Sequence, residues 1–200
     1  MRYDGSKRIR ASVILILAVV AIAVGFLADF LITCFEKNAY PREYAEYVDH
    51  YAEVYGVPET LIYAVIRTES GFDSGAVSSA GAVGLMQMLP ETFAWLTDEI
   101  LFEHLESGML YDPETNIRYG TYLLSRLYDR YGSWEVALAA YNGGVGNVDK
   151  WLEDPAYSDG DGGLKKIPFR ETRQYVKKIT NAYETYERLY GKEYDEDVTK

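Results

Sequence analysis

The stretch TESGFDSGAVSSAGAVGLMQMLPET, residues 68–92, follows an apolar helical segment and ends in a proline that opens another helix. In the preceding segment, PETLIYAVIRTES, the spacing of three and four places the apolar residues on one helix face: Leu61, Ile62, Val65 and Ile66. Glu69 follows Ile66 by three residues and therefore shares this buried face. Burial disfavours a charged carboxylate, so this position is costly without a role. The sequence predicts that Glu69 is a functional acid with a raised pKa.

The rest of the chain also follows helical spacing. Asp112 is a candidate N-cap before Pro113, and Ser133 is a candidate N-cap for the next helix. Period-2 alternation is limited to, at most, a small hairpin near residues 75–84. The predicted class is mostly α, a single globular domain, with helices over residues 42–55, 58–70, 90–96, 112–132 and 133–144 and after residue 168.

An apolar segment precedes this domain. Residues 11–28 carry no charge, and only Asp29 interrupts the apolar run to Phe35. About 20 apolar residues suffice to span a bilayer, so residues 11–35 predict a transmembrane signal-anchor. The cationic residues 1–10 predict a cytoplasmic tail, which puts the remaining chain outside. Two alternatives stay open: cleavage at an A-x-A site at residues 21–23, and lipidation of Cys34.

Charge and composition exclude several classes of function. Residues 36–200 contain 16 Lys and Arg against 29 Asp and Glu, a net charge of −13. Such a surface repels nucleic acid and anionic lipid. The two histidines have no metal-ligand spacing, and GAVGLMQ lacks the lysine of a phosphate-binding loop. We therefore expect no metal and no cofactor. The one cysteine excludes an intrachain disulfide.

What remains is acid–base chemistry by carboxylates. Glycosidases pair a protonated acid with a second carboxylate. The near neighbour of Glu69 is Asp73, but it follows Gly71 and is better placed to cap the loop. A single acid without a partner is unusual for a hydrolase.

Four ordered motifs resemble the soluble-lytic-transglycosylase-like (SLT) family, of lysozyme-like fold. They are the ES at residues 69–70, AVSSAGAVGLMQ at 76–87, ALAAYNGGVGNV at 137–148 and IPFRETRQYV at 167–176. The resemblance covers residues 42–190, which we take as the catalytic domain, followed by an acidic tail at 191–200. Leu89 departs from the methionine common in the family, which puts subsite preference in doubt.

The resemblance implies a peptidoglycan lytic transglycosylase. Members of the family cleave the β-1,4 bond between N-acetylmuramic acid and N-acetylglucosamine without water, leaving 1,6-anhydro ends. One glutamate protonates the glycosidic oxygen and then deprotonates the C6 hydroxyl of the same sugar. Because intramolecular attack has a high effective molarity, no second carboxylate is needed.

The resemblance assigns catalysis to Glu69 and substrate contacts to Ser78, Gln87, Tyr141, Asn142 and Tyr175. Several of these contacts have a structural alternative: a loop-capping hydroxyl for Ser78, a structural amide for Gln87 and core packing for Tyr175. Asn142 could instead pin its loop. The expected partner is the glycan strand, and the expected location is the membrane, with the domain facing the cell wall. Two rival functions remain, a goose-type lysozyme-like hydrolase and a non-catalytic wall-binding module.

Overall fold

The computed structural model describes residues 5–100 and 102–197 of the 200-residue chain. The chain forms two compact units, Met1–Pro41 and Arg42–Lys200. The first unit is one helix, α1 (Gly5–Ala39). Its segment Val13–Ala39 is long and apolar enough to cross a membrane, by length and composition.

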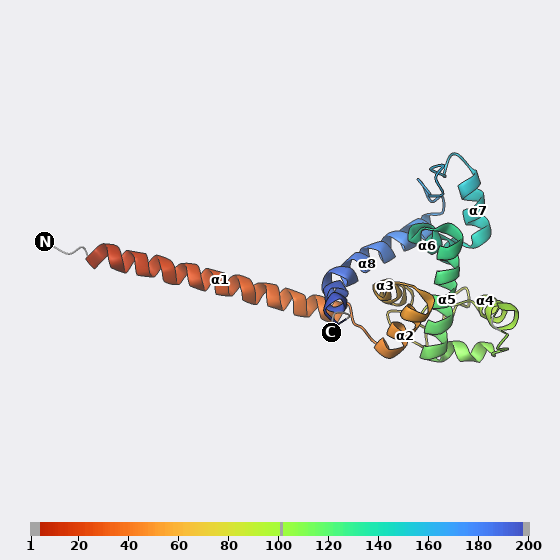
Figure 1. Cartoon of the computed structure of the whole chain (residues 1–200), viewed down its shortest axis with the longest axis horizontal. Coiled ribbons are helices and arrows are strands. Elements are labelled where there is room, and N and C mark those ends of the chain that lie inside the picture. The colour runs from red at the N-terminus through yellow and green to blue at the C-terminus, as the bar shows by residue number, and fades with distance from the viewer. Residues whose placement is uncertain (1–4, 101, 198–200) are drawn as a thin grey trace. The chain divides into compact units, whose positions relative to one another are not determined.

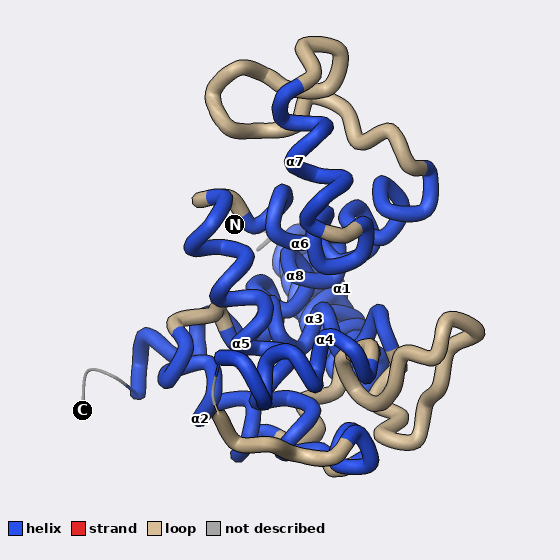
Figure 2. The backbone as a smooth tube through the Cα atoms, turned by 90° about the vertical axis from the view of Figure 1, so that its right-hand side faces the viewer, coloured by secondary structure: helices blue, strands red, loops and turns tan. Residues whose placement is uncertain are grey.

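The second unit is built from helices, as the sequence predicts (Figure 2). Its elements are α2 (Ala45–Tyr55), α3 (Glu59–Glu69), α4 (Pro90–Trp95), the π-helix η1 (Leu96–Ile100), the 3-10 helix η2 (Ser107–Tyr111), α5 (Pro113–Tyr131), α6 (Trp134–Gly143), α7 (Val145–Glu153) and α8 (Arg170–Asp197). Among the described residues the hairpin region forms isolated bridges instead of strands, from Val83 to Val77 and to Met88. The mostly helical fold class is confirmed.

Helix α3 is the centre of this unit. All seven residues from Thr60 to Ile66 are buried, so the helix is covered on every side over two turns. Helices α2 and α8 pack against it, and α6 packs against both α5 and α8 (Figure 1). The face predicted to be inward is therefore confirmed, and α3 approaches the surface at its first residue, Glu59, and in its last turn.

Local residue choices explain several helix ends. The Asp112 carboxylate accepts the backbone N–H of Thr115 at 2.8 Å, which confirms this N-cap. Ser133 occupies the N-cap position of α6 but makes no side-chain capping bond. Helix α2 begins at Ala45, later than predicted, because Tyr44 has a left-handed backbone with φ of 60°.

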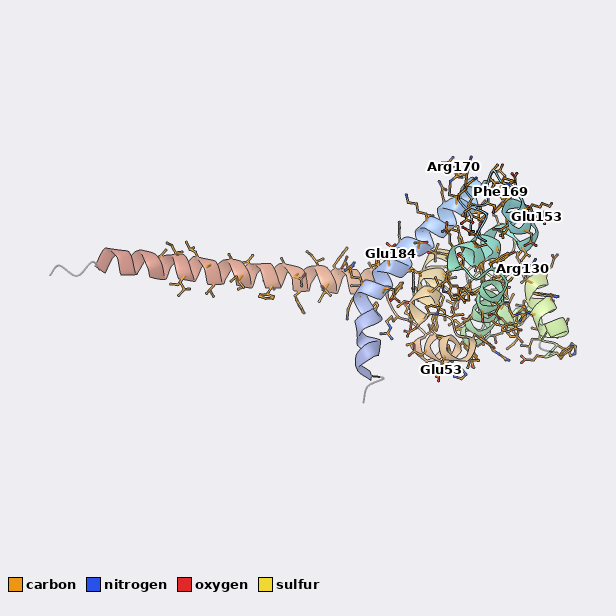
Figure 3. All side chains as sticks on the ribbon, turned by 45° about the horizontal axis from the view of Figure 1, so that its top comes forward. Glu53, Arg130, Glu153, Phe169, Arg170 and Glu184 are labelled. Carbon is orange, nitrogen blue, oxygen red and sulfur yellow. The ribbon has the colours of Figure 1, made fainter. Side chains whose placement is uncertain are left out.

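Helix α8 closes the domain after the long loop of residues 154–169. Phe169 and Arg170, where this loop meets the helix, lie at the same end of the domain as Glu153, the last residue of α7 (Figure 3). The helix continues to Asp197 and so enters the acidic tail expected at 191–200. Residues 198–200 of that tail and residues 1–4 of the basic tail lie outside the described residues.

Candidate functional site

Glu69 is the last residue of α3, at the point where the buried helix reaches the surface. Ser70 follows it as the C-cap, and its backbone N–H donates to the carbonyl of Ile66. Burial raises the pKa of the Glu69 carboxyl from its ordinary value of 4.5 to about 7. The carboxyl therefore exchanges a proton near neutral pH, as the sequence predicted for this position.

Two tyrosines from distant helices surround this acid. The hydroxyl of Tyr175 on α8 donates to Glu69 Oε1 at 2.7 Å, and this bond lowers the carboxyl pKa against the effect of burial. Tyr141 on α6 donates its hydroxyl to the carbonyl of Met86 at 2.8 Å. Burial, followed by the charge of Glu69, raises the pKa of both tyrosines well above 10.0. Both phenols therefore remain protonated donors beside the acid.

The loop after Glu69 is held by its own side chains. Ser70 Oγ donates to the carbonyl of Leu85 at 2.8 Å, which brings the distant end of the loop back to α3. The Ser78 hydroxyl accepts the backbone N–H of Ala82 at 3.0 Å. The Gln87 amide donates to the carbonyls of Ala76 and Gly84. Ser78 and Gln87 thus have structural bonds in this loop, and their roles toward a substrate stay predictions.

Asn116, a residue that the sequence analysis did not single out, holds the second half of the loop in place. Asn116 of α5 is fully buried and accepts the Met86 N–H at 2.7 Å. Its amide donates to the carbonyls of Val83 and Leu110 at 2.9 and 2.8 Å. A Cβ on Gly84 would meet the Asn116 amide nitrogen at 2.2 Å, so only glycine fits there. The available signal was an asparagine on the apolar face of the helix predicted at 112–132.

Asn142 lies exposed beside Tyr141, on the wall of a pocket of about 420 Å³. The pocket lies between the end of α6 and the first turn of α8, and its other lining residues are Gly143, Phe169, Arg170, Glu171 and Thr172. Thr172 and Tyr175 are three residues apart on α8, so the pocket lies about one helical turn from the phenol that bonds Glu69. This pocket is large enough for part of an extended ligand.

Other acidic groups do not share the site. The Asp73 carboxylate accepts the backbone N–H of Gly75 at 2.9 Å, which is the loop-capping role favoured for it. In residues 5–100 and 102–197, burial and Tyr175 account for the shifted pKa of Glu69, and no second carboxylate contributes. Within the same ranges, no group of three or more His, Cys, Asp or Glu could hold a metal.

The site therefore consists of one half-buried acid, two phenols and a loop of small residues. Residues 46–162 match the family described as the transglycosylase SLT domain. The chain belongs to this family. The SLT match begins within α2 and ends in the loop before α8, so it includes Glu69 and Tyr141.

Curated relatives of the chain are lytic murein transglycosylases by name. The soluble lytic murein transglycosylase of Escherichia coli (strain K12) is 35% identical over 177 residues, covering 87% of this chain and 26% of its own length. Membrane-bound lytic murein transglycosylase C of Edwardsiella ictaluri is 31% identical over 179 residues, covering 77% of this chain and 48% of its own. The chain thus spans about a quarter to a half of the length of these relatives.

A solved structure shares the fold. The lytic transglycosylase Slt of Pseudomonas aeruginosa, an inactive mutant with glutamine in place of a glutamate, superposes with a TM-score of 0.68 and 33% identity. The match covers 76% of this chain and 25% of that chain. The expected lytic-transglycosylase type of fold is confirmed.

Proposed function

We propose that this protein is a membrane-anchored peptidoglycan lytic transglycosylase. It cleaves the β-1,4 bond between N-acetylmuramic acid and N-acetylglucosamine and leaves 1,6-anhydro ends on the glycan. The observation that carries this proposal is the single acid Glu69, whose pKa of about 7 suits both proton donation and proton acceptance near neutral pH. The names of the relatives support the same reaction.

In the first step, the protonated Glu69 carboxyl donates its proton to the glycosidic oxygen. The bond from that oxygen to C1 of the muramyl sugar breaks, and the leaving sugar departs with a hydroxyl group. Burial keeps Glu69 protonated up to about pH 7, so the acid form is available for this donation. The exposed loop of glycine, alanine and serine next to Glu69 allows a sugar chain to approach closely.

In the second step, the Glu69 carboxylate takes the proton from the C6 hydroxyl of the muramyl sugar. The C6 oxygen bonds to C1 and closes the anhydro ring, which returns Glu69 to its acid form. Tyr175 supports this step because its hydroxyl, 2.7 Å from Glu69 Oε1, stabilises the charged carboxylate. The nucleophile belongs to the substrate, so the mechanism needs no second carboxylate to hold a water.

Within this proposal Glu69 is the catalytic residue, and Ser78, Gln87, Tyr141, Asn142 and Tyr175 line the glycan-binding cleft. The exposed Asn142 and the pocket of about 420 Å³ beside it would receive part of the glycan strand. Helix α1 would be the single membrane anchor, with residues 42–190 as the catalytic domain outside the cytoplasm. Anchoring would keep the domain at a high effective concentration near its polymer.

The test is to incubate the full chain in detergent with purified peptidoglycan and to identify the released fragments by mass spectrometry. Fragments lighter by one water than the hydrolysed ones, and absent with Glu69→Gln, are the expected result. Reducing-end fragments would instead show a goose-type lysozyme-like hydrolase. Binding to the polymer without any cleavage would indicate a wall-binding module.

A further inference from the structure

A second pocket lies away from Glu69, and most of its charged lining residues are cations. It has a volume of about 310 Å³ and lies between the loop before α8, the start of α6 and one side of α8. Four of its lining residues are cationic, Lys165, Lys166, Arg173 and Lys177, against one carboxylate, Glu135. This local excess of positive charge stands in a domain whose residues 36–200 have a net charge of −13.

The cations of this pocket are largely uncompensated. In the part of the chain that the structure describes, Lys166, Arg173 and Lys177 form no ion pair. Lys165, in contrast, already has partners. Its ammonium donates to the carbonyl of Pro155. Backbone N–H groups lower the pKa of Asp159, and the charge of Lys165 lowers it further. Three cations are therefore available to an anion.

The pocket also has a fixed guanidinium and an apolar floor. Arg173 Nη1 donates to the carbonyl of Ile167 at 2.7 Å, which ties the loop to α8 and orients the remaining N–H donors. The buried side chains on the floor are Leu164, Ile167 and Val176, at most 9% exposed. The exposed Thr180 and Asn181 add polar groups on the same side of α8.

Helix geometry separates this pocket from the catalytic cleft. At 100° per residue, Arg173, Lys177 and Thr180 share one side of α8, whereas Tyr175, which bonds Glu69, points about 160° away from Arg173. A ligand in this pocket would therefore occupy the opposite side of α8 from the acid.

We propose that this pocket binds the carboxylate end of a peptide stem of peptidoglycan, on a strand other than the one being cleaved. The inference rests on the proposed function, since it takes peptidoglycan as the polymer. Such stems end in a free carboxylate next to short alkyl side chains. The cations match the carboxylate and the apolar floor matches the alkyl groups, whereas a phosphate polymer would leave this floor unused. The second contact would hold the enzyme on the wall by multivalency.

The experiment uses the full-length Glu69→Gln chain in neutral detergent micelles, with N-acetyl-D-alanyl-D-alanine as the probe, followed by NMR. We expect saturable shifts of the backbone amides of Lys166 and Lys177. The same dipeptide with an amidated C-terminus should bind at least about tenfold more weakly, because it lacks the charge. Lys177→Glu should weaken binding of the dipeptide acid by about tenfold or more. Added salt should also weaken the binding of this dipeptide to the Glu69→Gln chain.

The matched control is Lys178→Glu, the same charge change one residue along α8, which should leave the affinity unchanged. Equal binding of the acid and the amide, equal loss in both lysine variants, or no saturable shift at these amides would each overturn the inference. Saturable binding of glycerol phosphate in preference to the dipeptide would also overturn it and would indicate an anionic wall polymer. Fragment release by the wild-type chain is read separately, so failure here is distinct from failure of the proposed reaction.

Discussion

Replacing Glu69 by glutamine should change how the stability of the fold depends on pH. Burial raises the pKa of this carboxyl from 4.5 to about 7. A folded carboxyl with a raised pKa contributes stability below about pH 4.5, and that contribution is lost as the pH rises through about 7. At roughly 1.4 kcal/mol for each pKa unit, the wild type should lose about 3 kcal/mol over this window. The glutamine variant should lose none of it, since its amide does not titrate.

The measurement is the free energy of unfolding in urea, followed by tryptophan fluorescence at several pH values from about 4 to about 8. The quantity of interest is the difference between variant and wild type, because shifts of all other groups cancel in it. The difference should move in favour of Glu69→Gln by about 3 kcal/mol as the pH rises. The Tyr175 hydroxyl can still donate to the glutamine carbonyl, so the local bond survives.

Glu53→Gln is the matched control, because it makes the same change at an exposed carboxylate on α2 (Figure 3). If the control shows a difference of the same size, the effect comes from the loss of one negative charge and not from the burial of Glu69. Parallel stability curves for wild type and Glu69→Gln would refute the reasoning on burial altogether.

Three further predictions concern the same site. Tyr175→Phe removes the hydrogen bond that lowers the Glu69 pKa. The pH at which kcat falls on the alkaline side should therefore rise by about one unit, and an unchanged pH profile would contradict this. Asn116→Ala should lower the free energy of unfolding by about 3 kcal/mol, measured in urea, because it removes three buried hydrogen bonds to the backbone, of which only the Val83 carbonyl keeps a second donor, the N–H of Met88. A loss under about 1 kcal/mol would contradict it. Gly84→Ala and Gly81→Ala share a φ of +81°, but only Gly84 lacks space for a Cβ, so thermal unfolding should show a clearly larger loss for Gly84. Equal losses for the two glycine variants would mean that backbone strain, and not the contact with Asn116, requires glycine.

The helices were predictable because each follows a local rule. The apolar spacing of three and four marks the buried faces, and Asp112 before Pro113 marks the start of α5, where the structure shows the capping bond. Glu69 was predictable for the same reason, since its place on a buried face three residues after Ile66 implies burial. The upward direction of the pKa shift follows from that burial.

The path of the loop was not predictable from local sequence. Phe72 and Gln87 have φ of 71° and 48°, a region that side chains with a Cβ rarely adopt. The second half of the loop is also held from outside the stretch, by the buried Asn116, which bonds Met86 and Val83 from 30 and 33 residues away along the chain. No pattern of spacing within residues 68–92 carries that information.

The cationic pocket could not be predicted from the sequence for a related reason. Its cations appear in the sequence as ordinary surface lysines and an arginine, in a chain of strongly acidic composition. They become a site only when the loop is tied to α8 through the bond from Arg173 to the Ile167 carbonyl. The composition correctly indicates an acidic surface on average, but it cannot show where in the fold cations gather.

The pKa of Glu69 results from two opposing effects that come from different parts of the chain. Helix α3 buries the carboxyl and raises its pKa, whereas the Tyr175 hydroxyl, contributed by α8 from 106 residues away, lowers it. An acid buried more deeply would have a still higher pKa, so it would stay protonated but would give its proton to the glycosidic oxygen less readily. A solvated acid would be ionised before it could donate. A value of about 7 allows one residue to serve as acid and then as base in a single turnover, which is what a reaction with an internal nucleophile requires.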